Sequence, residues 1–106
     1  MQELCDQFLR EKLYLYNASP RTIKYLSNVL HVWRKHAELP TKDNLKEWVI
    51  KLIESGISPA TVNSYIRGLN TFLTWLHNEK GIEKLRIKPI KEEKPTLKTF
   101  SEKRRL

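Results

Sequence analysis

Hydrophobic residues recur along this chain at intervals of three and four, the spacing that places them on one face of a helix. Turn-forming residues divide the pattern into four stretches. We expect helices from about Gln2 to Leu15, from the Ser19 cap to shortly before Leu39-Pro40, from Thr41 to Gly56, and from Ser58-Pro59 to Gly81. No strand-like alternation competes with this pattern. The sequence therefore predicts an all-α protein, a compact four-helix bundle with short loops and an extended basic C-terminal tail.

We expect the side chains in the apolar stripe of each helix to form the core. Trp75 lies off the main stripe of the fourth helix, where it either joins the core or borders a domain interface. The stripes comprise Leu4, Phe8, Leu9, Leu13 and Leu15; Ile23, Leu26, Leu30, Trp33 and Ala37; Leu45, Trp48, Val49, Leu52 and Ile53; and Val62, Tyr65, Ile66, Leu69, Phe72, Leu73 and Leu76.

The second and fourth helices begin with the same pattern. Ser19-Pro20-Arg21-Thr22 and Ser58-Pro59-Ala60-Thr61 are offset by 39 residues (58 less 19). In both, Ser is a preferred N-cap residue, and Pro occupies the first helical position, where its missing N–H costs nothing. Two helices that start alike raise the question of what they do together.

The character of the chain changes after Gly81. Lys and Arg alternate with apolar residues, and Pro89 and Pro95 prevent a helix. Thr99-Phe100-Ser101-Glu102 then has the pattern of a new helix cap. We therefore expect a helical domain over residues 1–81, a basic extended linker over 82–98, and the truncated start of another domain over 99–106.

Charge indicates the class of partner. The 106 residues carry a formal net charge of +8, of which residues 82–106 contribute +5 (nine Lys and Arg less four Glu). Such a balance favours polyanionic partners such as nucleic acid or an anionic membrane surface. A single Cys5 excludes an internal disulfide, and no apolar run or signal peptide pattern indicates a membrane. We expect a soluble, cytoplasmic protein that is monomeric in isolation.

Two helix faces combine cations and amides without an acid. Opposite their apolar stripes, the second helix presents Lys24, Asn28, His31 and Lys35, with Arg21 nearby, and the fourth presents Asn63, Arg67, Asn70 and Thr74. A solvated face normally mixes Glu with Lys. Lys and Arg neutralise phosphates, Arg can bind guanine, and Asn can bind adenine. The alternative is that both faces are merely solvated and that the bundle is a protein–protein interaction module.

At these residues the chain resembles the core-binding, SAM-like domain of tyrosine recombinases, the phage integrase family. The resemblance rests on three motifs in order, which span nearly the whole chain. They are Ser19-Pro20-x-Thr22-Ile23-x-Tyr25 followed by Leu30 and Trp33; Ile57-Ser58-Pro59-Ala60-Thr61-Val62-Asn63-x-Tyr65-Ile66-x-x-Leu69-x-x-Phe72-x-x-Trp75-Leu76; and Pro95-Thr96-Leu97-x-Thr99-Phe100-Ser101-Glu102, which is similar to the start of the family's catalytic domain.

This resemblance implies a four-helix bundle that forms half of a clamp around duplex DNA at a core-type recombination site, with the second and fourth helices at the major groove. It also implies contact with other recombinase protomers in a synaptic complex. The DNA-binding residues that we expect are Arg21, Lys24, Asn28, His31, Asn63, Arg67, Asn70 and Thr71 in the helices, and Lys84, Arg86, Lys88 and Lys91 on the phosphate backbone.

We expect no catalysis from this chain. The family's nucleophilic tyrosine, arginines, lysine and His-x-x-Arg element belong to a catalytic domain. His31-Val32-Trp33-Arg34 matches that spelling, but Trp33 lies on the core stripe and no second cluster accompanies it. There is no Gly-rich phosphate loop, and three His and one Cys lack metal-ligand spacing, so we expect neither a cofactor nor a metal.

Overall fold

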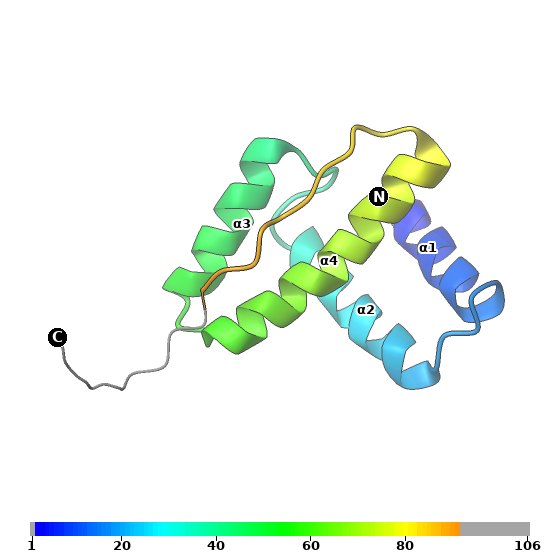
Figure 1. The fold of residues 1–106 in the computed structure, drawn as a ribbon, viewed down its shortest axis with the longest axis horizontal. Coiled ribbons are helices and arrows are strands. Elements are labelled where there is room, and N and C mark those ends of the chain that lie inside the picture. The colour runs from blue at the N-terminus through cyan, green and yellow to red at the C-terminus, as the bar shows by residue number, and fades with distance from the viewer. Residues whose placement is uncertain (1, 92–106) are drawn as a thin grey trace, which may run out of the picture.

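The computed structural model describes residues 2–91. Within that range the protein folds into four helices without a strand, as the hydrophobic pattern predicts (Figure 1). They are α1 (Gln2–Tyr14), α2 (Pro20–Arg34), α3 (Lys42–Glu54) and α4 (Pro59–Lys80). Residues 92–98 of the expected linker, and the expected domain start at 99–106, lie outside the described residues.

The helix ends follow the caps that the sequence indicates. The hydroxyls of Ser19 and Ser58 accept hydrogen bonds from the N–H groups of Thr22 and Thr61, at 3.2 and 3.3 Å. Thr41 forms a reciprocal capping box at the start of α3. Gly81 ends α4 with a φ of 68°, a conformation that glycine adopts at little cost.

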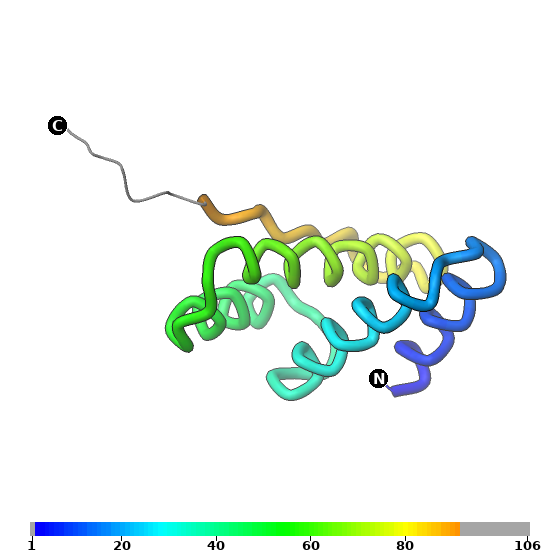
Figure 2. The backbone as a smooth tube through the Cα atoms, turned by 90° about the horizontal axis from the view of Figure 1, so that it is seen from below, coloured from blue at the N-terminus to red at the C-terminus, as the bar shows by residue number. Residues whose placement is uncertain are grey.

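Helix α4 occupies the middle of the molecule. It packs against α2 and α3, and α2 packs in turn against α1. Figure 1 shows α2 passing behind α4, and the view from below in Figure 2 places α2 and the chain after Gly81 on opposite sides of α4. The core is centred on α4. Five of its side chains are no more than 2 % exposed: Val62, Ile66, Leu69, Phe72 and Leu73.

Two expected core positions are wrong. Leu15 is 73 % exposed because α1 ends one residue earlier, and Ile53 is 47 % exposed near the end of α3. Two residues outside the expected stripes, Cys5 and Val29, are buried instead. Trp75 belongs to the core, where it stacks on Phe72.

The crossing of α2 and α4 depends on Gly68. A Cβ atom at this position would lie 2.9 Å from Cγ2 of Val29 and 3.1 Å from the Tyr25 hydroxyl. Val29 is fully buried, and the Tyr25 hydroxyl donates a hydrogen bond to the Ser64 carbonyl of α4. Neither neighbour can move away without disturbing the crossing, so the absence of a side chain sets how closely the two helices approach.

No helix within residues 2–91 is both long and apolar enough to cross a bilayer.

Replacing Gly68 with Ala tests this close approach. In a helix interior, Ala normally adds about 1 kcal/mol of stability relative to Gly. Here we expect the opposite sign, a loss of about 1–2 kcal/mol in the free energy of unfolding, because overpacking a filled core costs about 1–3 kcal/mol. Urea denaturation measures the difference. Thr74→Ala, an exposed position on the same helix, is the control and should not destabilise; stabilisation by Gly68→Ala would contradict the packing described here.

Candidate nucleic-acid interface

The chain after α4 turns back and runs along that helix as an extended segment, residues 82–91, which we call the strap (Figures 1 and 2). The side-chain amide of Asn70 donates to the Ile87 carbonyl at 2.9 Å and accepts from the Ile87 N–H at 2.8 Å. Asn63 makes the same pair of bonds with Ile90, at 2.9 and 2.8 Å. Each asparagine therefore replaces the backbone partner that Ile87 or Ile90 would have in a sheet.

The spacing of these contacts follows from helix and strand geometry. Seven residues separate Asn63 from Asn70, which is two turns, so both lie on one face and about 10.5 Å apart along the axis. Three residues of extended chain, from Ile87 to Ile90, cover about 10 Å. The two distances match, and the pairing makes the strap run antiparallel to α4. The two asparagines can therefore bind Ile87 and Ile90 at the same time.

These contacts correct the expectation for the fourth helix. Asn63 and Asn70 are only 5 % and 9 % exposed, and both ends of each amide are bound to the strap. An open polar face was expected here, and at these two positions that expectation is wrong. Contact between either asparagine and a base edge would require the strap to leave α4.

The strap also differs from the linker that was expected to begin at residue 82. Ile87 is 8 % exposed and belongs to the core, and Leu85 and Ile90 pack against it. The four expected phosphate-binding cations, which alternate with these apolar side chains, are all exposed: Lys84, Arg86, Lys88 and Lys91. Packing therefore continues past the expected domain boundary at residue 81, and the cations project into solvent from a backbone that is held against the core.

On α2 the structure brings together four of the expected residues. Arg21, Lys24, Asn28 and His31 are exposed and line one broad depression between α2 and the end of α1. None of the described residues that line this depression is acidic. The second helix thus presents cations, an amide and an imidazole to solvent together, as its sequence predicts.

The other two expected helical positions, Arg67 and Thr71, also lie on α4. Arg67 is exposed, one turn after Asn63 on the same side of the helix. Thr71 is half-buried, and its hydroxyl donates to the Arg67 carbonyl at 3.1 Å. Arg67 is therefore the only one of the four expected α4 residues that is exposed, and it carries a charge.

Both Ser-Pro helices begin on the lower side of the molecule in Figure 1, α4 at its left and α2 at its right. Neither has an acidic residue in its first turn, whereas α1 and α3 carry Glu3 and Asp43 there. The strap runs to the start of α4, because Ile90 is bound to Asn63 in the second turn. The last strap cations consequently lie near the positive end of α4, whereas the positive end of α2 lies at the other end of the molecule.

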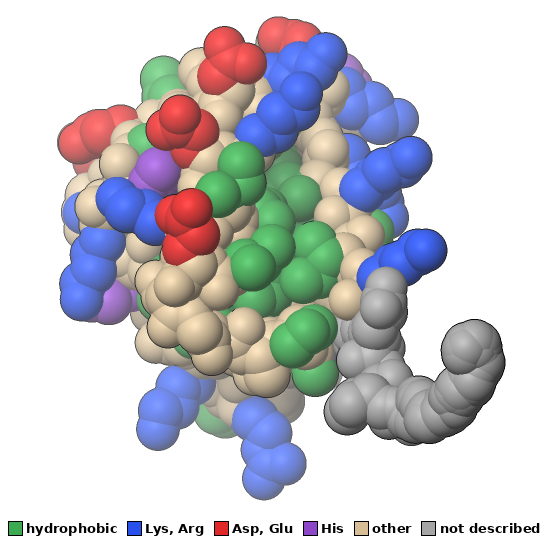
Figure 3. All heavy atoms as spheres, turned by 90° about the vertical axis from the view of Figure 1, so that its left-hand side faces the viewer, with side chains coloured by type: hydrophobic (Ala, Val, Ile, Leu, Met, Phe, Trp, Pro, Cys, Tyr) green, Lys and Arg blue, Asp and Glu red, His purple; other side chains and the backbone are tan. Residues whose placement is uncertain are grey.

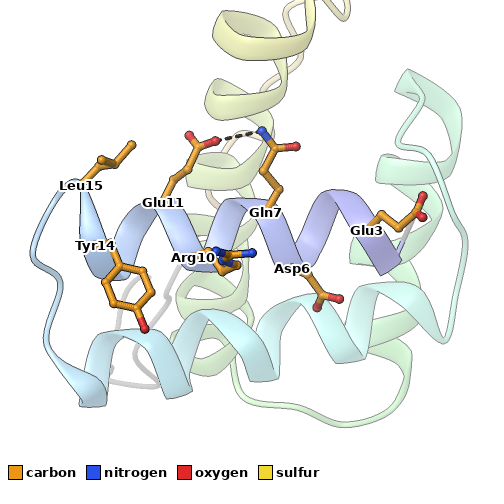
Figure 4. A pocket seen from close by; sticks show the side chains of 7 residues that line it. All are labelled: Glu3, Asp6, Gln7, Arg10, Glu11, Tyr14 and Leu15. Atoms are coloured by element: carbon orange, nitrogen blue, oxygen red, sulfur yellow. Dashed lines mark hydrogen bonds between the residues drawn. The ribbon is translucent and has the colours of Figure 1, made fainter.

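A second depression, beside α1, mixes charges of both signs. Figure 4 shows the side chains of Asp6, Arg10 and Glu11 among those around it. Hydrogen bonds from Trp75 at 2.9 Å and then from Gln7 lower the pKa of Glu11. Glu11 is thus an ionised acceptor that holds Trp75 and orients α1, which is a structural role.

Two further observations bear on chemistry. Burial raises the pKa of the Cys5 thiol, which disfavours the reactive thiolate. Across the part of the chain that is described, no group of three or more His, Cys, Asp and Glu lies close enough to hold a metal ion.

The sequence analysis did not predict the strap anchor, by which we mean the hydrogen bonds of Asn63 and Asn70 to Ile90 and Ile87, although its signals are present. Two Asn seven residues apart on one helix face, followed by Leu85, Ile87 and Ile90 at nearly alternating positions, describe a helix that holds an extended segment. The basic residues and Pro89 are equally typical of an extended linker that makes no such contacts.

Comparison of the chain with protein-family models, with curated proteins and with solved structures finds no match.

Asn70→Ala tests the strap anchor. The change removes both hydrogen bonds between the Asn70 side chain and the backbone of Ile87. The buried N–H and carbonyl of Ile87 are then unpaired, which costs about 1–3 kcal/mol of unfolding free energy. We expect that loss in urea denaturation, and faster hydrogen exchange at the Ile87 amide by NMR. Asn28→Ala, at an exposed position of α2, should change stability by no more than about 0.5 kcal/mol. An Ile87 amide that stays equally protected in Asn70→Ala would show that the strap is held in another way.

Proposed function

We propose that this chain is a double-stranded DNA-binding domain of the tyrosine recombinase kind, with the SAM-like core-binding fold, and that it is not itself catalytic. The observation that carries the proposal is the acid-free, exposed cluster of Arg21, Lys24, Asn28 and His31 on α2. Cations that neutralise phosphates stand there beside an amide that can bind a base edge. The four-helix architecture and the sequence motifs agree with that family.

The repeated Ser-Pro start supports the same proposal. Backbone N–H groups at a helix start attract anions, and α2 and α4 begin on one side of the molecule without first-turn acids. Arg21 and Lys24 lie in the first two turns of α2, so their charges add to the positive end of that helix. A duplex along this side would meet both helix starts.

The strap supplies the remaining cations in this proposal. A flexible basic linker loses conformational entropy when it follows a phosphate backbone. Here the two asparagines hold the backbone of Lys84, Arg86, Lys88 and Lys91 in place before DNA arrives. In the corrected assignment, Asn63 and Asn70 position these cations, and α2, Arg67 and the strap contact the DNA.

Removing two α2 cations tests the function. We expect Arg21→Ala/Lys24→Ala to weaken binding to duplex DNA roughly tenfold and to lower the slope of log affinity against log salt by about two, since each lost phosphate contact contributes about 0.9. Fluorescence anisotropy of a labelled duplex at several salt concentrations measures both quantities.

The control removes the same amount of charge elsewhere. Arg10→Ala/Lys51→Ala takes two exposed cations from α1 and α3. Its DNA affinity should stay within about twofold of the unmodified chain, because screened charges away from the interface contribute little. Equal losses in both double variants would reduce the interaction to net charge alone, and the absence of DNA binding at low salt would reject the proposal.

A further inference from the structure

A groove with an apolar floor lies between α3 and the strap; we call it the α3–strap groove. Leu45, Val49 and Ile50 of α3 face Leu85 and Ile87 of the strap across it, and it encloses about 460 Å³. Leu45, Val49 and Ile87 are nearly buried, whereas Ile50 is 53 % exposed. In Figure 3, which views the molecule from the left-hand side of Figure 1, hydrophobic side chains gather in the middle of the surface.

Cations occupy both sides of this groove. Lys42 and Lys46 are one turn apart on α3, and Arg86 and Lys88 project from the strap two residues apart, on the same side of the extended chain. Figure 3 shows Lys and Arg side chains along one edge of the apolar patch and Asp and Glu side chains on the opposite side of it. No acidic residue is among the described residues that line the groove. The lining is thus an apolar floor with cations on its α3 side and on its strap side, and the acidic side chains of α3, among them Asp43 and Glu47, lie outside the groove.

We propose that the α3–strap groove binds an amphipathic helix of a partner protein that carries apolar anchors flanked on both sides by Asp or Glu. The apolar floor requires apolar side chains, which a phosphate backbone does not offer. The cations that line both sides of the groove favour negative charge on the flanks of the ligand. A helix laid in a groove meets both needs, because its anchors recur at three and four residues and its acids can stand beside them.

The strap makes this surface possible. Without the strap, only the α3 side of the groove would remain, and α3 would lose Leu85 and Ile87, the apolar side chains across the groove. The hydrogen bonds of Asn70 to Ile87 hold the second wall in place. This inference goes beyond DNA binding. The groove shares Arg86 and Lys88 with the proposed DNA contacts, but its other wall is α3, which those contacts leave out.

A designed probe tests the proposal on the full chain. The probe is a fluorescein-labelled helical peptide with Leu and Phe anchors at positions i, i+4 and i+7, flanked by Glu on both sides. One comparison peptide replaces its anchors with Ser, and another replaces its Glu with Lys. We expect saturable anisotropy binding of the first peptide only.

Two substitutions at exposed groove positions, Ile50→Glu and Lys46→Glu, should each weaken the first peptide roughly tenfold, as expected of residues at the centre of an interface. Leu39→Glu is the matched control for Ile50, since its side chain is 52 % exposed against 53 %, and Lys51→Glu is the control for Lys46. Both controls should stay within about twofold. Circular dichroism checks that all four variants remain folded.

Several results would overturn the proposal. They are the absence of binding, equal binding of the peptide that lacks anchors, and equal losses in the groove and control variants. A further one is a Lys46→Glu variant that loses affinity for duplex DNA but keeps its affinity for the peptide, which would assign this side of the groove to nucleic acid. None of these outcomes bears on the Arg21→Ala/Lys24→Ala result, so the two proposals fail separately.

Discussion

The pairing of two asparagine side chains with the backbone of the strap is the interaction on which the surface of this protein depends. An extended segment against a helix has no backbone partners of its own, and buried unpaired N–H and carbonyl groups are costly. Asn63 and Asn70 satisfy those of Ile87 and Ile90, which lets the strap bury Ile87 against the core. Each of the proposed binding surfaces relies on the position that results.

One consequence is a change in the role of α4. Its central turns hold the strap with one face and α2 with another, where Gly68 permits the close crossing. A helix used on so many sides has little surface left for a ligand, and of its expected DNA contacts only Arg67 is exposed. The side chains of α2, which are exposed around one depression, therefore carry more of the proposed DNA contact than the symmetry of the two helix starts suggests.

A second consequence is that the two proposed surfaces share cations. Arg86 and Lys88 belong to the exposed cations of the strap and also to one side of the α3–strap groove. An acidic helix in the groove would neutralise charges that the proposed DNA contact uses. The strap is the element through which one ligand can affect the other, because its backbone position is common to both.

The sequence predicts the local structure of this protein far better than its long-range contacts. Helix bounds follow from signals within a few residues, such as Ser19-Pro20 or Gly81, and the described structure agrees with them closely. Burial of Asn63 could not be predicted from helix periodicity, since that pattern reports only that the residue lies opposite the apolar stripe. The strap covers that face, because Ile90, 27 residues later, binds Asn63. It can do so because the distance from Asn63 to Asn70 along α4 matches the distance from Ile87 to Ile90 along the strap. The exposed cluster on α2 was predictable because no other part of the described chain packs on it.

The most direct test of this account is an NMR titration of the full chain with duplex DNA. The account predicts shifts of the backbone amides from Arg21 to His31 and of the strap cations. The side-chain amides of Asn63 and Asn70 should keep their resonances, and the Ile87 and Ile90 amides should keep their slow exchange. Large shifts of the two asparagine amides, together with loss of protection at Ile87 and Ile90, would contradict it, because they would show that DNA displaces the strap and contacts α4 directly.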